Sequence, residues 1–227
     1  MSDVAVTRRG RPRLTDEERA GRRRDLTVAA IDAIRDHGAD QSLDELAGHL
    51  GVSKPVLYDV FGSRAGLADA VAVELADRMQ PLLLRRIGPP RPDGSYPVTV
   101  DRIIEVVVES LLGLVEQEEQ LYLFVAVSIG GERRGLLDNA LVQVVHERIR
   151  PVIEVAAPTL SADEHTVLTD GIYGLVLATL ESWQTTGAPS RDVVVRMLST
   201  VIREGLHAIA EQSGVEGAEG AEGADPH

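Results

Sequence analysis

The sequence predicts an all-α protein, and three observations predict it. Apolar residues recur at helical spacing along almost the whole chain. No stretch combines period-two alternation with the paired turn signals of a β-hairpin. Ser-x-x-Glu capping boxes precede two apolar segments, at Ser42 and Ser161. The expected architecture is an N-terminal set of helices that a proline-rich connector joins to a second helical domain.

Four helices are expected before residue 88. Gly38 ends the first, because glycine readily takes the conformation that follows a helix. Ser42 and Glu45 form the capping box of the second, which is about eight residues long. Pro55 lies in the first turn of the third, where proline is tolerated. The expected helices lie at about 22–37, 42–49, 54–61 and 63–86.

Residues 88–97, GPPRPDGSYP, contain four prolines and two glycines, so they predict a connector and a domain boundary. A turn is expected at GGERRG (130–135), and Pro151 is expected to kink its helix. Later helices are expected at about 98–118, 121–128, 136–157, 161–186 and 190–212. The predicted units are a flexible basic arm (1–20), a first domain (21–87), a second domain (98–212) and a disordered acidic tail (213–227).

The charge of the chain is unevenly distributed. The first 64 residues hold 11 basic and 11 acidic side chains, whereas the remainder holds 12 and 25. Residues 8–24 contain eight arginines and three acids, which concentrates basic charge in the arm and its approach to the first helix. An acidic second half is repelled by phosphate, so it favours an approach to nucleic acid through the N-terminal end.

Several classes of protein are excluded by composition and pattern. The chain has no cysteine, and its six histidines show no close pair at metal spacing, so we expect no disulfide, metal or cofactor. No signal peptide and no apolar run of membrane-spanning length is present, which predicts a soluble, cytoplasmic protein without a membrane partner. Glu105, Glu109 and Glu116 have the spacing of a solvated helix face, and no catalytic motif accompanies them. We therefore expect no enzyme.

Residues 43–61, LDELAGHLGVSKPVLYDVF, fit a helix-turn-helix. Ala47 is small where the two helices meet, Gly51 suits the turn, and an apolar set of Val52, Leu57 and Val60 closes a small core. The outer face of the third helix then carries Ser53, Lys54, Pro55, Tyr58 and Asp59. Lys54, Tyr58 and Arg64 are suited to DNA phosphates. The alternative is an ordinary helical hairpin.

The segment GVSKPVLYDVFGSRAGL (51–67), preceded by a helix ending in HGAD, resembles the TetR family of bacterial transcription regulators. Leu57, Tyr58, Phe61, Arg64 and Leu67 match the family pattern, although Arg64 stands where lysine is usual and Gly66 where an acidic residue is common. The resemblance is specific over residues 20–80.

This resemblance implies an N-terminal three-helix, helix-turn-helix DNA-binding domain joined to a helical-bundle ligand-binding and dimerisation domain. It further implies a homodimeric repressor that binds a palindromic double-stranded DNA operator and is released by a small-molecule effector. The alternatives are a ligand-dependent activator of the same family and an architectural protein that binds A·T-rich DNA.

The arm has an Arg-Gly-Arg-Pro core that is similar to the AT-hook, an extended segment that lies in a narrow minor groove. The alternative is a solvated basic tail that attracts phosphate nonspecifically. The residues expected to contact DNA are Arg8, Arg9, Arg11, Arg13, Ser42, Ser53, Lys54, Pro55, Tyr58 and Arg64.

The dimer interface is expected on the last two helices. On the first of these helices, three small residues allow a second helix to approach closely: Gly171, Gly174 and Ala178. On the last helix, four residues form an apolar strip: Val194, Leu198, Val201 and Ile202. The alternative is burial within the same subunit. An effector pocket is expected to combine apolar walls with a few aromatic or polar groups, which suggests Tyr122, Phe124, Ser128, His146, Tyr173 and Trp183 unless these belong to the core.

Overall fold

The computed structural model describes residues 15–130 and 140–222, and within these ranges the chain is helical with no strand. The all-α prediction is therefore confirmed. The helices are α1 (Asp16–His37), α2 (Leu43–His49), α3 (Lys54–Phe61), α4 (Arg64–Ile87), α5 (Val100–Gln117), α6 (Glu119–Gly130), α7 (Ala140–Arg148), α8 (Arg150–Ala156), α9 (Ala162–Thr186) and α10 (Arg191–Glu222).

The first helix begins earlier than expected, at Asp16 rather than near Arg22. Thr15 is its N-cap, and the Thr15 hydroxyl accepts a hydrogen bond from the Glu18 N–H at 3.2 Å. The Glu18 carboxylate accepts one from the Thr15 N–H at 2.7 Å. This capping box satisfies two N–H groups at the helix start. The basic residues from Arg19 to Arg24 therefore lie on a helix.

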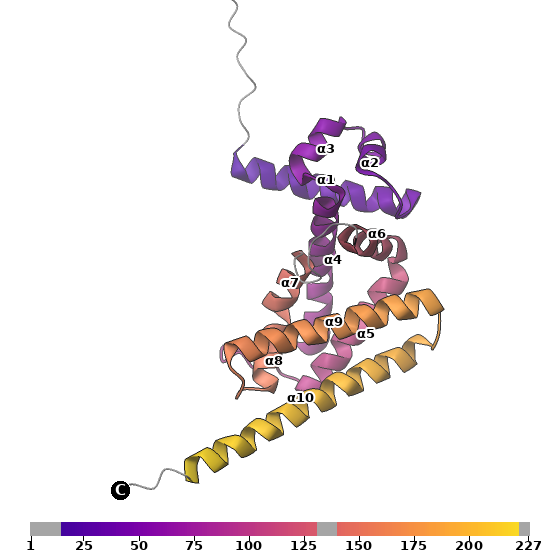
Figure 1. The fold of residues 1–227 in the computed structure, drawn as a ribbon. Coiled ribbons are helices and arrows are strands. Elements are labelled where there is room, and N and C mark those ends of the chain that lie inside the picture. Colours follow the sequence, from indigo (N-terminus) through magenta and orange to yellow (C-terminus); the bar gives the residue numbers. More distant parts are fainter. Residues whose placement is uncertain (1–14, 131–139, 223–227) are drawn as a thin grey trace, which may run out of the picture.

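The helices form two groups at opposite ends of the molecule, and α4 runs from one group to the other (Figure 1). The first three helices gather at one end, and α9 and α10 lie toward the other. The first core is built from α1–α4, with Ile31, Leu46, Leu57 and Leu67 completely buried. A second core is formed mainly by α5, α9 and α10, around Leu112 and other side chains. The long α4 therefore carries the N-terminal helices on the bundle.

Packing crosses the proline-rich connector. The connector lies between α4 and α5, as the sequence predicts. However, Leu121, Phe124 and Val125 of α6 are buried in the same core as α1–α4. Ile87, at the end of α4, packs instead with Ile103 and other residues of α5 and α8. The first core thus includes a segment from beyond the connector.

Two expectations for the second half are wrong. We expected one kinked helix over 136–157, but α7 ends at Arg148 and α8 begins at Arg150, because Pro151 lacks an N–H and suits only a helix start. The turn expected at 130–135 lies outside the described residues from 131 onward. We also expected the last helix to end near residue 212, but α10 continues to Glu222. The rest of the expected disordered tail, residues 223–227, lies outside the described residues.

Candidate nucleic-acid interface

A tight turn joins α2 to α3 and fixes the angle between them. Gly51 has a φ of +64°, a left-handed conformation that glycine adopts without steric cost. The Val52 N–H donates to the Ala47 carbonyl oxygen at 3.0 Å. The side chains of Leu46, Ala47 and Leu57 are completely buried. The predicted helix-turn-helix is therefore present, with a packed interior.

The exposed face of α3 is polar. Leu57 and Phe61 are buried, whereas Tyr58 is 49% exposed. Ser53 is the N-cap, and its hydroxyl makes no capping hydrogen bond, so it is available to an external acceptor or donor. The other exposed side chains of this face are Lys54, Pro55 and Asp59. The structure thus brings four of the predicted DNA-contacting residues, Ser53, Lys54, Pro55 and Tyr58, onto one short helix.

Two of the residues predicted to contact DNA, Lys54 and Ser42, have partners in the protein. Lys54 forms an ion pair with Asp44 of α2, and this hydrogen bond raises the pKa of the Lys54 amine. The Ser42 hydroxyl accepts from the Glu45 N–H at 3.2 Å and donates to the Glu45 carboxylate at 2.7 Å. The Ser42 side chain is therefore occupied in capping α2.

Arg64 has an internal role that sequence reasoning did not predict. Its guanidinium donates to the carbonyl oxygens of Ala39 at 2.6 Å and Gln41 at 3.0 Å. It also lies over the Phe124 ring of α6, with its central carbon 4.4 Å from the ring centroid. Burial lowers the pKa of Arg64. Arg64 thus ties the loop before α2 to α4 and α6.

Arg23 is a second structural residue that sequence reasoning missed. Its guanidinium donates to the Val60 carbonyl oxygen at 2.6 Å and to the Gly66 carbonyl oxygen at 3.2 Å. It also lies 5.0 Å from the centroid of the Phe61 ring. Arg23 therefore holds the end of α3 and the start of α4 against α1. The sequence offers no signal that separates Arg23 from Arg22 and Arg24, because only the tertiary fold shows which arginine faces inward.

Polar contacts also join the N-terminal helices to the start of α6. Arg35 donates to both carboxylate oxygens of Glu118, at 2.9 and 2.5 Å. The Ala39 N–H donates to the side-chain oxygen of Gln120 at 2.9 Å. The α2–α3 unit is therefore fixed to the bundle through α1 and the loop before α2. The arm residues Arg8, Arg9, Arg11 and Arg13 lie outside the described residues.

The six predicted effector residues do not gather in one described cavity. Phe124 is completely buried in the first core, and the Ser128 hydroxyl donates to the Phe124 carbonyl oxygen. The indole N–H of Trp183 donates to the Pro189 carbonyl oxygen at 2.9 Å. Tyr173 is buried. The Nε2 of His146 lies 2.7 Å from an Asp170 carboxylate oxygen. Burial raises the pKa of the Tyr122 phenol.

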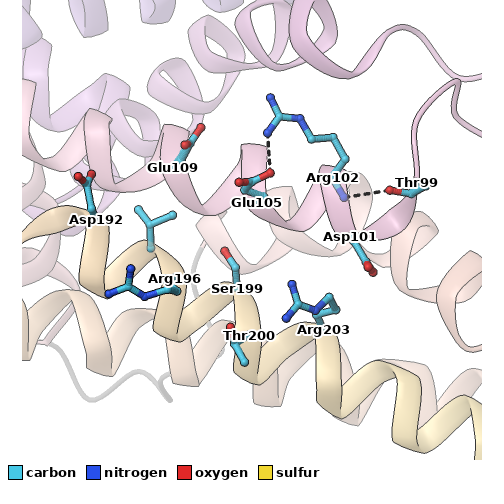
Figure 2. A pocket seen from close by; sticks show the side chains of 11 residues that line it. Thr99, Asp101, Arg102, Glu105, Glu109, Asp192, Arg196, Ser199, Thr200 and Arg203 are labelled. Carbon is cyan, nitrogen blue, oxygen red and sulfur yellow. Dashed lines mark hydrogen bonds and ion pairs between the residues drawn. The ribbon is translucent and has the colours of Figure 1, made fainter.

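An open groove of about 560 Å³ lies between α5 and α10. Figure 2 shows Arg196 and Arg203 rising from α10 on either side of Ser199, opposite acidic residues of α5. Neighbours already neutralise α5 carboxylates: Glu105 pairs with Arg102 at 2.5 Å, and Glu109 pairs with Arg86. The groove thus has charged walls, unlike the largely apolar walls of most small-molecule pockets.

An apolar hollow of about 190 Å³ lies between α9 and α10. Gly171 and Leu175 of α9 and Val201 of α10 line it. Val201 is 57% exposed, and Met197 on the same helix is 58% exposed. Three residues of the predicted strip on α10, Val194, Leu198 and Ile202, are instead buried in the subunit's own core.

Two further properties bear on function. No helix of the described ranges combines the length and apolar character needed to cross a membrane. Within the same ranges, no group of three or more histidine or carboxylate side chains is arranged to hold a metal ion.

Comparison with solved structures supports the fold. A putative transcriptional regulator from Pseudomonas aeruginosa PAO1 matches with a TM-score of 0.54 at 16% identity, over 88% of this chain and 95% of that one. A putative transcriptional regulator from Rhodococcus sp. RHA1 also gives 0.54, at 19% identity, over 81% and 95% of the two chains.

Comparison of sequences supports the family. Residues 26–71 match the family model described as "Bacterial regulatory proteins, tetR family". An uncharacterized HTH-type transcriptional regulator of Mycobacterium tuberculosis is 28% identical over 217 residues, or 93% of this chain and 88% of that protein. The HTH-type transcriptional activator FasR of Mycolicibacterium smegmatis is 39% identical over 89 residues, 35% of this chain and 41% of FasR. With the helix-turn-helix geometry, these matches identify residues 26–71 as a TetR-type DNA-binding domain and support a TetR-family transcriptional regulator.

Proposed function

We propose that the protein is a homodimeric, ligand-responsive repressor that inserts α3 into the major groove of a palindromic operator. The observation that carries this proposal is the exposed polar face of α3, which is held on a buried interior. Ser53, Lys54 and Tyr58 are assigned to phosphates and Pro55 to the groove surface, with the arm residues in the minor groove. Such a division lets phosphate contacts set the register while the rest of α3 meets base edges.

Ser42 and Arg64 belong to this interface in a supporting role. The Ser42 hydroxyl caps α2, and Arg64 holds two carbonyl oxygens of the loop that precedes Ser42. Both residues therefore fix the position of α2 relative to α4. We assign them to positioning the DNA-binding surface.

The proposed dimer interface is the exposed apolar face of α9 and α10. Met197 and Val201 are more than half exposed, and the adjoining hollow is lined by apolar residues and glycines of both helices. A face of this kind is favourable to bury against a second copy. A dimer also supplies the two α3 helices that a palindromic site requires, about one DNA turn apart.

The proposed effector site lies in the bundle beyond α4. Tyr122 and His146 are the two members of the predicted set whose side chains are only partly buried. We assign them to polar contacts with the effector. The second candidate function is a ligand-dependent activator, because 89 residues of the chain align with FasR, an HTH-type transcriptional activator.

Selection of bound duplexes from a random library tests the proposal. A homodimeric regulator is expected to enrich a short palindrome and to protect it in footprinting, and a screen for molecules that dissociate this complex then identifies the effector class. Broad protection without a preferred sequence would favour an architectural protein. Absence of any duplex preference, with a monomer in solution, would overturn the proposal. Transcription in vitro from the selected site separates repressor from activator.

A further inference from the structure

The only lysine of the chain begins α3, and its amine is bound by an acid of the neighbouring helix. Lys54 pairs with Asp44, which lies in the first turn of α2. The Lys54 and Asp44 side chains are 61% and 43% exposed. Exposed ion pairs of this kind contribute little to folding stability. Folding stability therefore does not account for the pair, and its effect is sought in what Lys54 binds at this surface.

The position of the pair bears on DNA binding. Lys54 is on the polar face of α3, next to the N-cap Ser53, whose hydroxyl is free of a capping bond. A phosphate that approaches Lys54 meets an amine whose charge is already cancelled by a carboxylate. Either Lys54 leaves Asp44, or it stays and contributes no net charge to the contact. Both outcomes weaken the attraction of the surface for DNA.

We propose that Asp44 competes with DNA phosphate for Lys54 and thereby lowers the affinity of the protein for duplex DNA of any sequence. This inference rests on the proposed function, in which α3 faces DNA. Asp44 is thus an acidic residue built into a basic contact surface. It limits the time that the protein spends on nonspecific DNA, whose binding is essentially electrostatic.

The expected size follows from one unit of charge. Removing the carboxylate charge with Asp44→Asn is expected to tighten binding about three- to tenfold per subunit, the effect of one charge acting over several ångströms at the surface. If Lys54 stays with Asp44 in the wild-type complex, freeing it also makes the slope of log K against log salt steeper by about 0.9 per subunit; if Lys54 leaves Asp44, the slope is unchanged and only the affinity rises.

The experiment measures binding of the full chain to a fluorescein-labelled 30-base-pair duplex of random sequence at several salt concentrations. Four proteins are compared: wild type, Asp44→Asn, Lys54→Gln and the double variant. Lys54→Gln is expected to weaken binding about twofold in the wild type but about tenfold in the Asp44→Asn background, because only there is the amine free. Asp192→Asn, on the exposed start of α10, is the matched control and is expected to leave affinity unchanged within about twofold.

The binding measurements distinguish the proposed competition from its alternatives. Equal losses on Lys54→Gln in both backgrounds, or no gain of affinity from Asp44→Asn, would overturn the competition between Asp44 and phosphate while leaving the proposed function intact. Failure of the wild type and all variants to bind duplex, with unchanged circular dichroism spectra, would overturn both. A similar gain of affinity from Asp192→Asn would show that only net charge matters.

Discussion

Replacing Arg23 with methionine removes the guanidinium that links α1 to α3 and α4 but keeps most of the aliphatic stem. Two hydrogen bonds from a charged donor are lost, at 2.6 Å to Val60 and at 3.2 Å to Gly66. Hydrogen bonds to charged groups are worth about 1.5–3 kcal/mol each, and the longer bond and partial exposure place the sum near the low end. We expect Arg23→Met to lower the free energy of unfolding by about 3 kcal/mol.

Urea denaturation followed by circular dichroism measures this loss, with all proteins at the same concentration. Arg24→Met is the matched control, since Arg24 is the next residue of α1, is exposed, and loses the same charge. It is expected to change stability by less than about 0.5 kcal/mol. Arg23→Lys is expected to fall between the two, because one amine cannot reproduce the fork of a guanidinium. Equal stability of Arg23→Met and Arg24→Met would refute the reasoning.

Three other predictions concern separate parts of the molecule. Tyr58→Phe is expected to weaken operator binding by about 1 kcal/mol, similarly across operator variants, if its hydroxyl donates to a phosphate; equal affinities in a binding titration would contradict this. Val201→Asp is expected to convert a dimer to monomer in light scattering, because it places a charge in an apolar interface. Hydrogen bonds from Thr15 lower the pKa of Glu18, so Glu18 stabilises the fold above its unfolded pKa and loses this effect as pH falls through its folded pKa. Glu18→Gln should therefore destabilise the protein at pH 7 and have little effect near pH 2 in thermal melts.

Local signals predicted most of the helices correctly. Pro55 and the capping box at Ser161 marked helix starts, and the bounds of α3 and α9 agree with the structure. These signals depend on residues only a few positions apart, so the sequence alone is enough to recognise them. The start of α1 was missed although Thr15 and Glu18 carry the same signal, because the adjacent arginines were interpreted as part of an arm.

Long-range contacts could not be predicted in the same way. Arg23 and Arg64 bond to carbonyl oxygens 23 to 43 positions away, and such oxygens leave no mark on the sequence pattern. The same limit applies to the aromatic residues of the second half. Phe124 suits a pocket wall and a core position equally well by composition, and the structure places it in the first core.

The burial of α6 side chains among α1–α4 has a consequence for modular engineering of this regulator. A chimera cut at the proline-rich connector transfers the N-terminal helices without Leu121, Phe124 and Val125, and so leaves an apolar cleft open to solvent. The Arg64 guanidinium likewise loses the ring on which it rests. A DNA-binding unit that can be transferred to another protein therefore needs two pieces of chain, residues 15–87 and a matching α6.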